Sequence, residues 1–182
     1  MYRIVALVGE SGCGKDYAAS TLVEKYPHLF HQVISDTTRP KRDYEIDGLH
    51  YNFITSKKFA EYVLDGTMLE ATCFNDNWYY GTNKNSLVEN RINLVVLNPI
   101  GLERLKENTN IKVYSIYIQT FPIGRLMKCL QREGSPNCHE ICRRFLADEE
   151  MFKNFNGDIN IRNNYTEEFI DRLLDKIGEI TW

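Results

Sequence analysis

The sequence predicts an α/β fold in which a mostly parallel sheet is covered by helices on both faces. An apolar, β-branched run opens the chain at residues 3–8, and similar runs of strand length recur at 93–97 and 112–118. Segments with helical patterning separate these runs. Strands that alternate with helices require crossover connections, which make neighbouring strands parallel and bury both faces of the sheet.

Each element follows from its local pattern. The first helix begins at Lys15, directly after a glycine-rich turn, and stops near Pro27, because proline cannot continue a helix. Thr166 resembles a helix start, although the spacing of a capping box is not met. The expected elements are strands at 3–8, 93–97, 112–118 and 158–162, and helices at 15–26, 122–131, 140–152 and 166–177.

Two segments break this alternation. Residues 33–81 are rich in Thr, Arg, Tyr, Asn and Asp and contain a short strand-like piece at 51–54, which predicts an inserted, partly β flap over the carboxyl edge of the sheet. The polar, Gly/Pro-broken run at 132–137 predicts a mobile lid. We therefore expect one domain, with a core of 1–34, 82–124 and 148–182, an acceptor-binding flap of 35–81 and a helical lid of 125–147, since 182 residues suit one compact unit.

Composition narrows the function classes. The net charge of −3 gives no overall electrostatic reason to expect nucleic-acid or membrane binding, so any anion site must be local. The opening apolar run is too short to span a membrane and lacks a signal-peptide cleavage pattern, which predicts a cytoplasmic protein. Both a monomer and a homodimer are compatible with the sequence.

The five cysteines are an odd number scattered along the chain, which favours reduced thiols. Cys129, Cys138, His139 and Cys142 are soft metal ligands close together in sequence and raise the alternative of a structural zinc. That set lacks the tight Cys-x-x-Cys pairs typical of such sites, so free cysteines are the expectation.

Residues 9–15 carry the pattern G-x-x-x-x-G-K between an expected strand and an expected helix. Such a loop binds phosphate through its backbone N–H groups and the helix N-terminus, and Lys15 is placed to reach the β and γ phosphates. An ordinary glycine turn is the alternative. Asp16 stands where Ser or Thr normally ligates magnesium, and a carboxylate can take that role directly or through water. The expected phosphate-binding residues are Gly9, Ser11, Gly12, Cys13, Gly14, Lys15 and Asp16.

Further motifs follow in order: T-T-R-P-K-R from Thr37, a glutamate at position 70, Y-Y-G-T at 79–82, and arginines at 132, 143 and 144. With the phosphate loop, this order resembles the guanylate kinases across nearly the whole chain. The resemblance implies a P-loop NTPase fold with a parallel five-stranded sheet, and phosphoryl transfer from ATP to GMP with Mg²⁺ as cofactor.

The resemblance also implies roles for individual residues. Arginine forks bind a dianionic phosphate with paired hydrogen bonds, and a carboxylate can accept from guanine N1–H and its 2-amino group. Lid arginines would neutralise charge on the transferred group; their alternative is that of ordinary surface arginines on a helix. The implied GMP-binding residues are Ser35, Arg39, Arg42, Tyr51, Glu70, Tyr80 and Thr82, and the implied lid residues are Arg132 and Arg144, with Arg125 and Arg143 as helpers.

The chain departs from the family pattern where a D-x-D-x-Q-G motif is expected. Residues 96–101 replace it and retain only Asn98 as a polar residue at the aspartate positions, which puts magnesium positioning in doubt. Lys41 and Tyr44 replace a proline and a glycine of the family signature. Three alternatives stay open: dGMP as acceptor, a relative of the ribose 1,5-bisphosphate phosphokinases, and a non-catalytic binding module.

Overall fold

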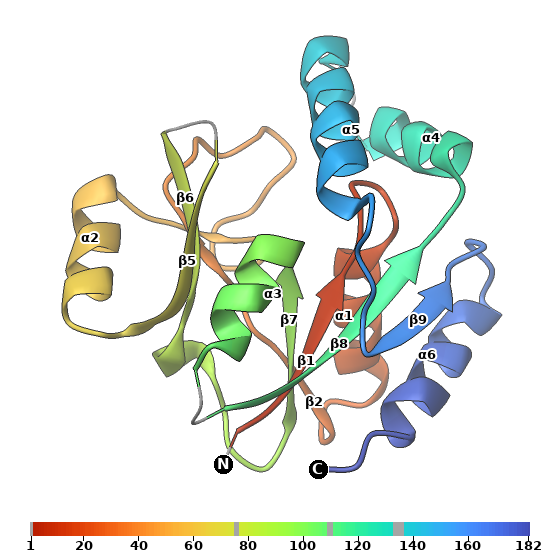
Figure 1. Cartoon of the computed structure of the whole chain (residues 1–182), viewed down its shortest axis with the longest axis horizontal. Helices are drawn as coiled ribbons and strands as arrows, with labels where there is room; N and C mark the ends of the chain where they lie inside the picture. The colour runs from red at the N-terminus through yellow and green to blue at the C-terminus, as the bar shows by residue number, and fades with distance from the viewer. Residues whose placement is uncertain (1, 75–76, 109–110, 133–136) are drawn as a thin grey trace.

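The computed structural model describes residues 2–74, 77–108, 111–132 and 137–182. Strands and helices alternate along most of the chain (Figure 1). The strands are β1 Arg3–Val8, β2 Phe30–Gln32, β3 Asp36–Thr37, β4 Asn52–Phe53, β5 Met68–Phe74, β6 Trp78–Asn83, β7 Ile92–Leu97, β8 Lys112–Gln119 and β9 Ile159–Arg162. The helices are α1 Lys15–Lys25, α2 Ser56–Leu64, α3 Pro99–Lys106, α4 Pro122–Arg132, α5 Cys138–Phe152 and α6 Glu168–Gly178, with a 3₁₀ turn at Lys84–Ser86.

The central sheet has five parallel strands in the order β2-β7-β1-β8-β9, which confirms the predicted α/β class. β1 lies in the middle, where Arg3 pairs with Ile92 of β7 and with Lys112 of β8. The carboxyl ends of these strands therefore meet at one edge, and the loop that leaves β1 emerges at its centre.

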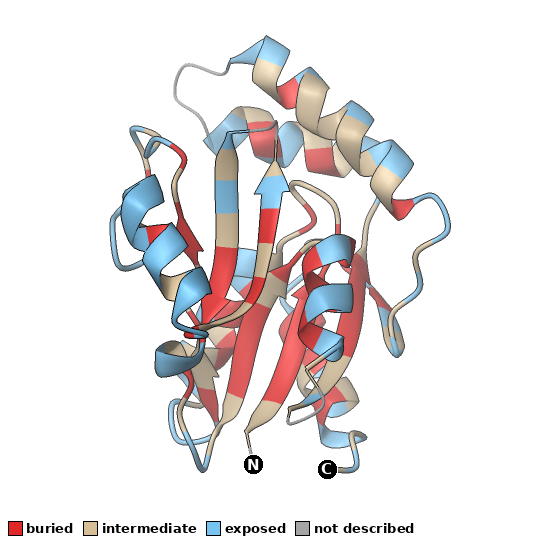
Figure 2. Ribbon diagram, turned by 60° about the vertical axis from the view of Figure 1, so that its left-hand side comes forward, coloured by how far each residue is buried: buried red, intermediate tan, exposed pale blue. Residues whose placement is uncertain are grey.

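Side chains from β1 alternate between two apolar layers. Val5 and Leu7 pack in a cluster with residues of α1 and α6. Ile4, Ala6 and Val8 pack on the opposite face, with residues of α3 and the end of α5. Figure 2 shows the strands of the central sheet as mostly buried and the outer faces of the helices as exposed. Helices thus cover both faces, as the sequence predicts.

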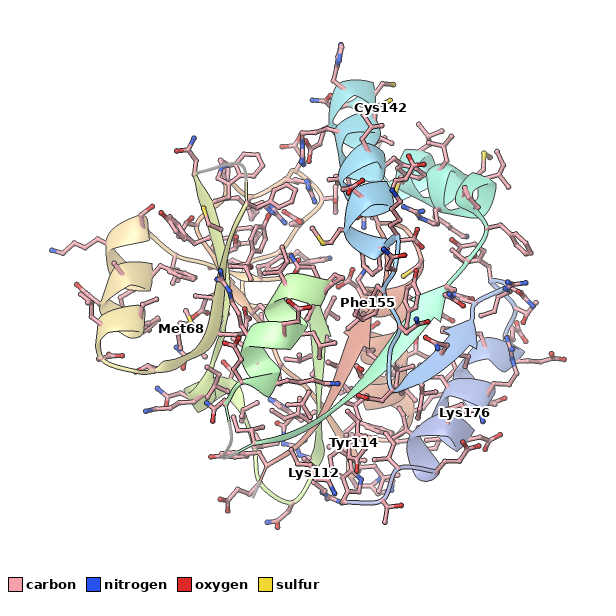
Figure 3. The ribbon with its side chains drawn as sticks, viewed as in Figure 1. Met68, Lys112, Tyr114, Cys142, Phe155 and Lys176 are labelled. Atoms are coloured by element: carbon pink, nitrogen blue, oxygen red, sulfur yellow. The ribbon has the colours of Figure 1, made fainter. Side chains whose placement is uncertain are left out.

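A second, four-stranded sheet of order β4-β3-β6-β5 forms within the insertion. The insertion also contains α2, which the sequence reading did not identify. Helix α2 packs on this sheet through buried Phe59, and Met68 of β5 lies on the side that faces α2 (Figure 3). The insertion is thus β-rich, and the piece predicted at 51–54 contains β4.

Two helices begin at other residues than the sequence predicts, and a side-chain cap explains one of the differences. Helix α5 begins at Cys138 rather than 140, since the side chain of Asn137 caps it and accepts from the Glu140 N–H at 3.1 Å. Helix α6 begins at Glu168 rather than 166 and has no side-chain cap. Of the predicted mobile segment 132–137, residues 133–136 lie outside the described part of the chain.

Three aromatic rings hold the end of α5 on the central sheet. Phe152 stacks on Tyr117 of β8 with ring centroids 5.5 Å apart, and Phe155 lies at 5.1 Å from the same ring, below α5 in Figure 3. Among the described residues, no helix is both long enough and apolar enough to cross a membrane.

Candidate active site

A cavity of about 400 Å³ opens where the carboxyl edge of the central sheet faces the second sheet and α5. Its walls combine the loop of residues 9–16, which we call the phosphate loop, and the flap of residues 35–81 with α4 and α5, which we call the lid helices. Of the residues expected from the sequence, it contains Gly9, Ser11, Gly12, Lys15, Asp16, Ser35, Arg39, Arg42, Tyr51, Glu70, Tyr80, Arg132 and Arg144. Arg143, expected as a helper, also lines it, whereas Cys13, Gly14, Thr82 and Arg125 are not among its lining residues.

The phosphate loop has the conformation that the glycine pattern predicts. Gly14 adopts a φ of +98° immediately before α1, and a Cβ there would lie 2.6 Å from the Asn163 amide nitrogen. Lys15 Nζ donates to the carbonyl oxygens of Gly9 at 2.5 Å and Glu10 at 3.0 Å, so its ammonium group lies against its own loop. Cys13 is fully buried, and burial raises the pKa of its thiol.

Two residues that the sequence reading missed fasten this loop from the far end of the chain. Asn163 Nδ2 donates to the Cys13 carbonyl at 2.9 Å, and the Tyr165 hydroxyl donates to the Gly12 carbonyl at 2.8 Å. Because 150 and 153 residues separate these partners, no local pattern could have found them.

The buried Arg125 joins the loop to both lid helices. Its Nη1 donates to Glu10 Oε1 at 2.7 Å, its Nε to the Ser11 carbonyl at 3.0 Å and its Nη2 to Asp148 Oδ2 at 2.9 Å. Burial raises the pKa of Glu10, and the Arg125 charge partly offsets this rise. The sequence singled out Arg125 only as a helper, and it offered no signal for Asp148.

Arg39 is more enclosed than a free phosphate-binding fork. Its guanidinium makes a bidentate ion pair with Glu45, and Glu45 also accepts from the Arg42 N–H at 2.8 Å. The same guanidinium lies 5.0 Å from the Tyr51 ring centroid and 5.3 Å from that of Phe53. The pKa of Glu45 is lowered despite its burial, because both arginine partners stabilise the carboxylate. Glu45 therefore orients residues 39–45, which we call the acceptor loop.

Tyr51 and Tyr80 stand next to each other in the cavity, with ring centroids 5.8 Å apart. Burial raises the pKa of both phenols. The nearby Asp16 carboxylate raises the Tyr51 pKa further, which places Asp16 within electrostatic reach of the acceptor side. Both hydroxyls therefore stay protonated and able to donate at neutral pH.

Glu70 is a buried carboxylate with one oxygen satisfied and one not. Its Oε1 accepts from the Thr82 hydroxyl at 2.8 Å, whereas its Oε2 is buried and has no hydrogen-bond partner. The side chain lines the cavity near Gly101, where a Cβ would lie 3.4 Å from Oε2. Thr82, expected among the GMP-binding residues, contacts Glu70 through its hydroxyl. An unpaired buried acceptor of this kind calls for a donor.

Glu70 also makes folding stability depend on pH. Burial raises its pKa from 4.5 to about 7, and the Thr82 hydroxyl only partly offsets this rise. The folded state then binds the Glu70 proton more tightly than the unfolded state does, so protonation of Glu70 increases the free energy of unfolding. This increase is complete below pH 4.5 and is lost as the pH rises through 7. Relative to Glu70→Gln, we expect the wild-type free energy of unfolding to fall by about 3 kcal/mol between pH 4 and pH 8. Urea unfolding of both proteins at both pH values measures it, and a constant difference would contradict the assignment.

Asn98, which stands in place of a family aspartate, has a structural task. Its Oδ1 accepts from the Gly101 N–H at 2.7 Å and so caps α3 directly after β7. That oxygen is committed to the helix N-terminus, although the residue lines the cavity.

Arg143 and Arg144 of α5 and Arg42 of the flap surround the carboxylate of Glu140. Glu140 Oε1 and Oε2 accept from Arg143 at 2.7 and 2.8 Å, and Arg42 of the acceptor loop approaches Oε1 at 3.5 Å. Arg144 Nε lies 3.6 Å from the same oxygen. Arg132 lies with its guanidinium 5.3 Å from the Tyr44 ring centroid, so both lid helices contact the flap.

The four residues considered as alternative zinc ligands do not form one cluster. Cys129 is buried next to Gly12 of the phosphate loop, whereas Cys138, His139 and Cys142 are exposed on α5, with Cys142 near its outer end in Figure 3. Within the described ranges, no group of three or more His, Cys, Asp or Glu residues is placed to hold a metal ion.

The comparisons of this chain with a family model and with individual known proteins agree on one family. The guanylate kinase family model matches residues 1–179. A guanylate kinase of Gloeobacter violaceus is 40% identical over 183 residues, which covers 94% of this chain and 86% of the relative. Disks large homolog 3 of Homo sapiens is 29% identical over 177 residues, covering 92% of this chain but only 21% of that protein.

The solved structures agree at the level of the fold. A guanylate kinase from Anaplasma phagocytophilum superposes with a TM-score of 0.64 over 97% of this chain and 85% of that one, at 21% identity. The phosphate loop, the enclosed arginine and the buried glutamate thus occur within a match that spans the chain, and on this evidence the chain belongs to the guanylate kinase family.

Proposed function

We propose that this protein transfers the terminal phosphoryl group of ATP to GMP, giving ADP and GDP. The observation that carries the proposal is Glu70 Oε2, a buried acceptor without a partner in a cavity shared with the phosphate loop. Guanine offers N1–H and its 2-amino group as adjacent donors, whereas adenine offers no such pair. A base that cannot donate leaves this carboxylate desolvated and unpaired, which costs about 1–3 kcal/mol or more.

The acceptor phosphate requires cationic and hydroxyl donors on the same side of the cavity. Arg42, with its guanidinium partly exposed, and the hydroxyls of Tyr51 and Tyr80 supply them. Arg39 adds positive charge while Glu45 fixes its orientation. Ser35 lines the same cavity and is assigned to the base. Arg132 and Arg144 are assigned to the transferring phosphoryl group.

The residues of the cavity suit a magnesium ion that takes only one or two of its ligands from the protein. Mg²⁺ usually keeps several waters and binds one or two carboxylates together with substrate phosphates. Asp16 is exposed in the first turn of α1, lines the cavity and is the carboxylate assigned to hold the ion directly or through water. When bound, the ion neutralises charge on the transferred phosphate. Asn98 is not assigned to the metal, because its oxygen caps α3.

A coupled ADP-release assay tests the reaction. MgATP is combined in turn with GMP, dGMP, AMP, CMP, UMP and ribose 1,5-bisphosphate. We expect turnover with GMP, extending to dGMP, and little with the other acceptors. Turnover confined to the sugar bisphosphate would assign the protein to that alternative activity. The cytoplasmic location and the monomer or homodimer state stay predictions.

The Asp16 assignment predicts a change in metal dependence. We expect Asp16→Ala to raise the magnesium concentration for half-maximal activity about tenfold, because a lost carboxylate ligand or its bound water is replaced less favourably. Magnesium titrations at fixed, saturating ATP and GMP measure the shift, with Asp43→Ala as a control that removes an exposed carboxylate from the flap. An unaltered titration would remove Asp16 from the metal site.

A non-catalytic binding module is the second candidate, because the match to Disks large homolog 3 covers only 21% of that protein and so places a similar sequence inside a much longer chain. The loop with Lys15 argues for catalysis, because a module that only holds an anionic partner has no need of a triphosphate cradle. Nucleotide binding without turnover on any acceptor would favour the module.

A further inference from the structure

One carboxylate oxygen lies at the mouth of the phosphate loop and accepts two hydrogen bonds there. Asp148 Oδ2 is 2.7 Å from the backbone nitrogen of Ser11 and 2.9 Å from Nη2 of Arg125. A loop N–H and a guanidinium N–H that converge on a single anionic oxygen make the geometry with which proteins bind a phosphate oxygen. Here an aspartate of α5 occupies it.

The two donors, the Ser11 N–H and the Arg125 guanidinium, are held in place by contacts that do not involve Asp148. Arg125 is only 4% exposed, and its remaining hydrogen bonds go to Glu10 and to the Ser11 carbonyl. Its guanidinium also lies 4.4 Å from the Phe145 ring centroid. At Gly12 the loop approaches so closely that a Cβ would lie 2.6 Å from the Arg125 carbonyl oxygen. The guanidinium and the loop therefore form one rigid unit.

The hydrogen-bond acceptor, the Asp148 carboxylate, belongs to a different element from the loop and lines the cavity. Asp148 lies on α5, two turns beyond Glu140, and its side chain is 14% exposed. Helix α5 also carries the lid arginines Arg143 and Arg144. Moving the carboxylate off Ser11 thus requires a change of the Asp148 side chain or of α5, while the loop stays in place.

We propose that the Ser11 N–H and Arg125 form a binding point for a phosphate oxygen of ATP, and that Asp148 competes for it as an internal anion. The inference rests on the proposed function, since it assumes that the loop takes ATP. The two donors cannot serve the carboxylate and a phosphate at once, so ATP must displace Asp148. Arg125 is then a phosphate-binding residue, and displacement of Asp148 couples nucleotide binding to the position of α5.

The first test measures ATP binding directly, by calorimetry on the full chain with magnesium. Removal of a competing anion should strengthen binding, so we expect Asp148→Ala to lower the Kd for ATP about tenfold, as expected for a charge-assisted hydrogen bond regained by the ligand. Glu149→Ala removes the same charge from the neighbouring, exposed position of α5 and should change the Kd by less than about twofold. The Kd for GMP should change in neither variant.

An unchanged or raised Kd for ATP in Asp148→Ala would overturn the proposal, since Asp148 would then support the loop instead of competing with the ligand. An equal gain in Glu149→Ala would overturn it too, by showing a general charge effect. Because ATP binding is measured without an acceptor, a failure of GMP turnover would refute the proposed reaction and leave this test intact.

The second test asks whether Arg125 is the donor that ATP gains. Arg125→Gln should weaken ATP binding about tenfold, and adding Asp148→Ala to it should restore little, because the guanidinium is gone. The same gain from Asp148→Ala in both backgrounds would remove Arg125 from the binding point. If Arg125→Gln fails to fold in a urea unfolding control, Arg125→Lys is compared in the same way, and the Asp148→Ala result stands by itself.

Discussion

Replacement of Lys15 by alanine is expected to lower kcat about 10²–10³-fold, the range seen when one preorganised electrostatic donor to a developing charge is removed. The Lys15 ammonium lies against the Gly9 and Glu10 carbonyls, and the residue lines the cavity. Its loss removes positive charge from the cradle while the backbone of the loop, fastened by Asn163 and Tyr165, stays in place.

Steady-state kinetics with saturating GMP and varied MgATP measure this effect. Lys25→Ala is the matched control, because Lys25 lies exposed in the last turn of the same helix. We expect the control to keep wild-type kcat and both variants to keep the wild-type Kd for GMP. A Lys15→Ala enzyme with unreduced kcat would show that the loop does not hold the transferred phosphate.

Replacement of Glu70 by glutamine is expected to lower kcat/KM for GMP about a hundredfold at pH 8, where the wild-type carboxylate is ionised. The amide nearly preserves the volume of the side chain but directs a donor or a single acceptor at guanine N1–H and the 2-amino group. Because AMP lacks this donor pair, its low activity should change little. The preference for GMP over AMP should therefore collapse, while the Kd for ATP, measured without an acceptor, should keep its wild-type value.

The control for charge removal is Glu61→Gln, on the exposed face of α2, where the Glu61 carboxylate pairs with Lys58 at 3.3 Å. It should leave the ratio of GMP to AMP activity unchanged. A preserved ratio in Glu70→Gln would refute the assignment of Glu70 to the base. Because urea unfolding of the same variant is also measured at pH 8, a loss of activity can be separated from a loss of folded protein.

Much of the fold was readable because its signals are local. The β-branched runs, the glycine-rich turn and Pro27 each act within a few residues, and they predicted the parallel sheet and the start of α1 at Lys15. Helices α2 and α3 are absent from the elements that the sequence predicts, because the formation of such short helices depends on their caps. Thr55 and Asn98 supply these caps, and neither was recognised as a helix start.

The candidate site divides in the same way. The sequence by itself determined which chemistry is present, since G-x-x-x-x-G-K, the arginines, the tyrosines and Glu70 carry it in their residue types and order. Only the tertiary structure decided how each group is used. It enclosed Arg39 with Glu45, left one oxygen of Glu70 without a partner, and placed Asp148 on the loop 137 residues away. The physical reason is that burial, charge pairing and hydrogen-bond satisfaction depend on contacts between distant segments, which no spacing along the chain encodes.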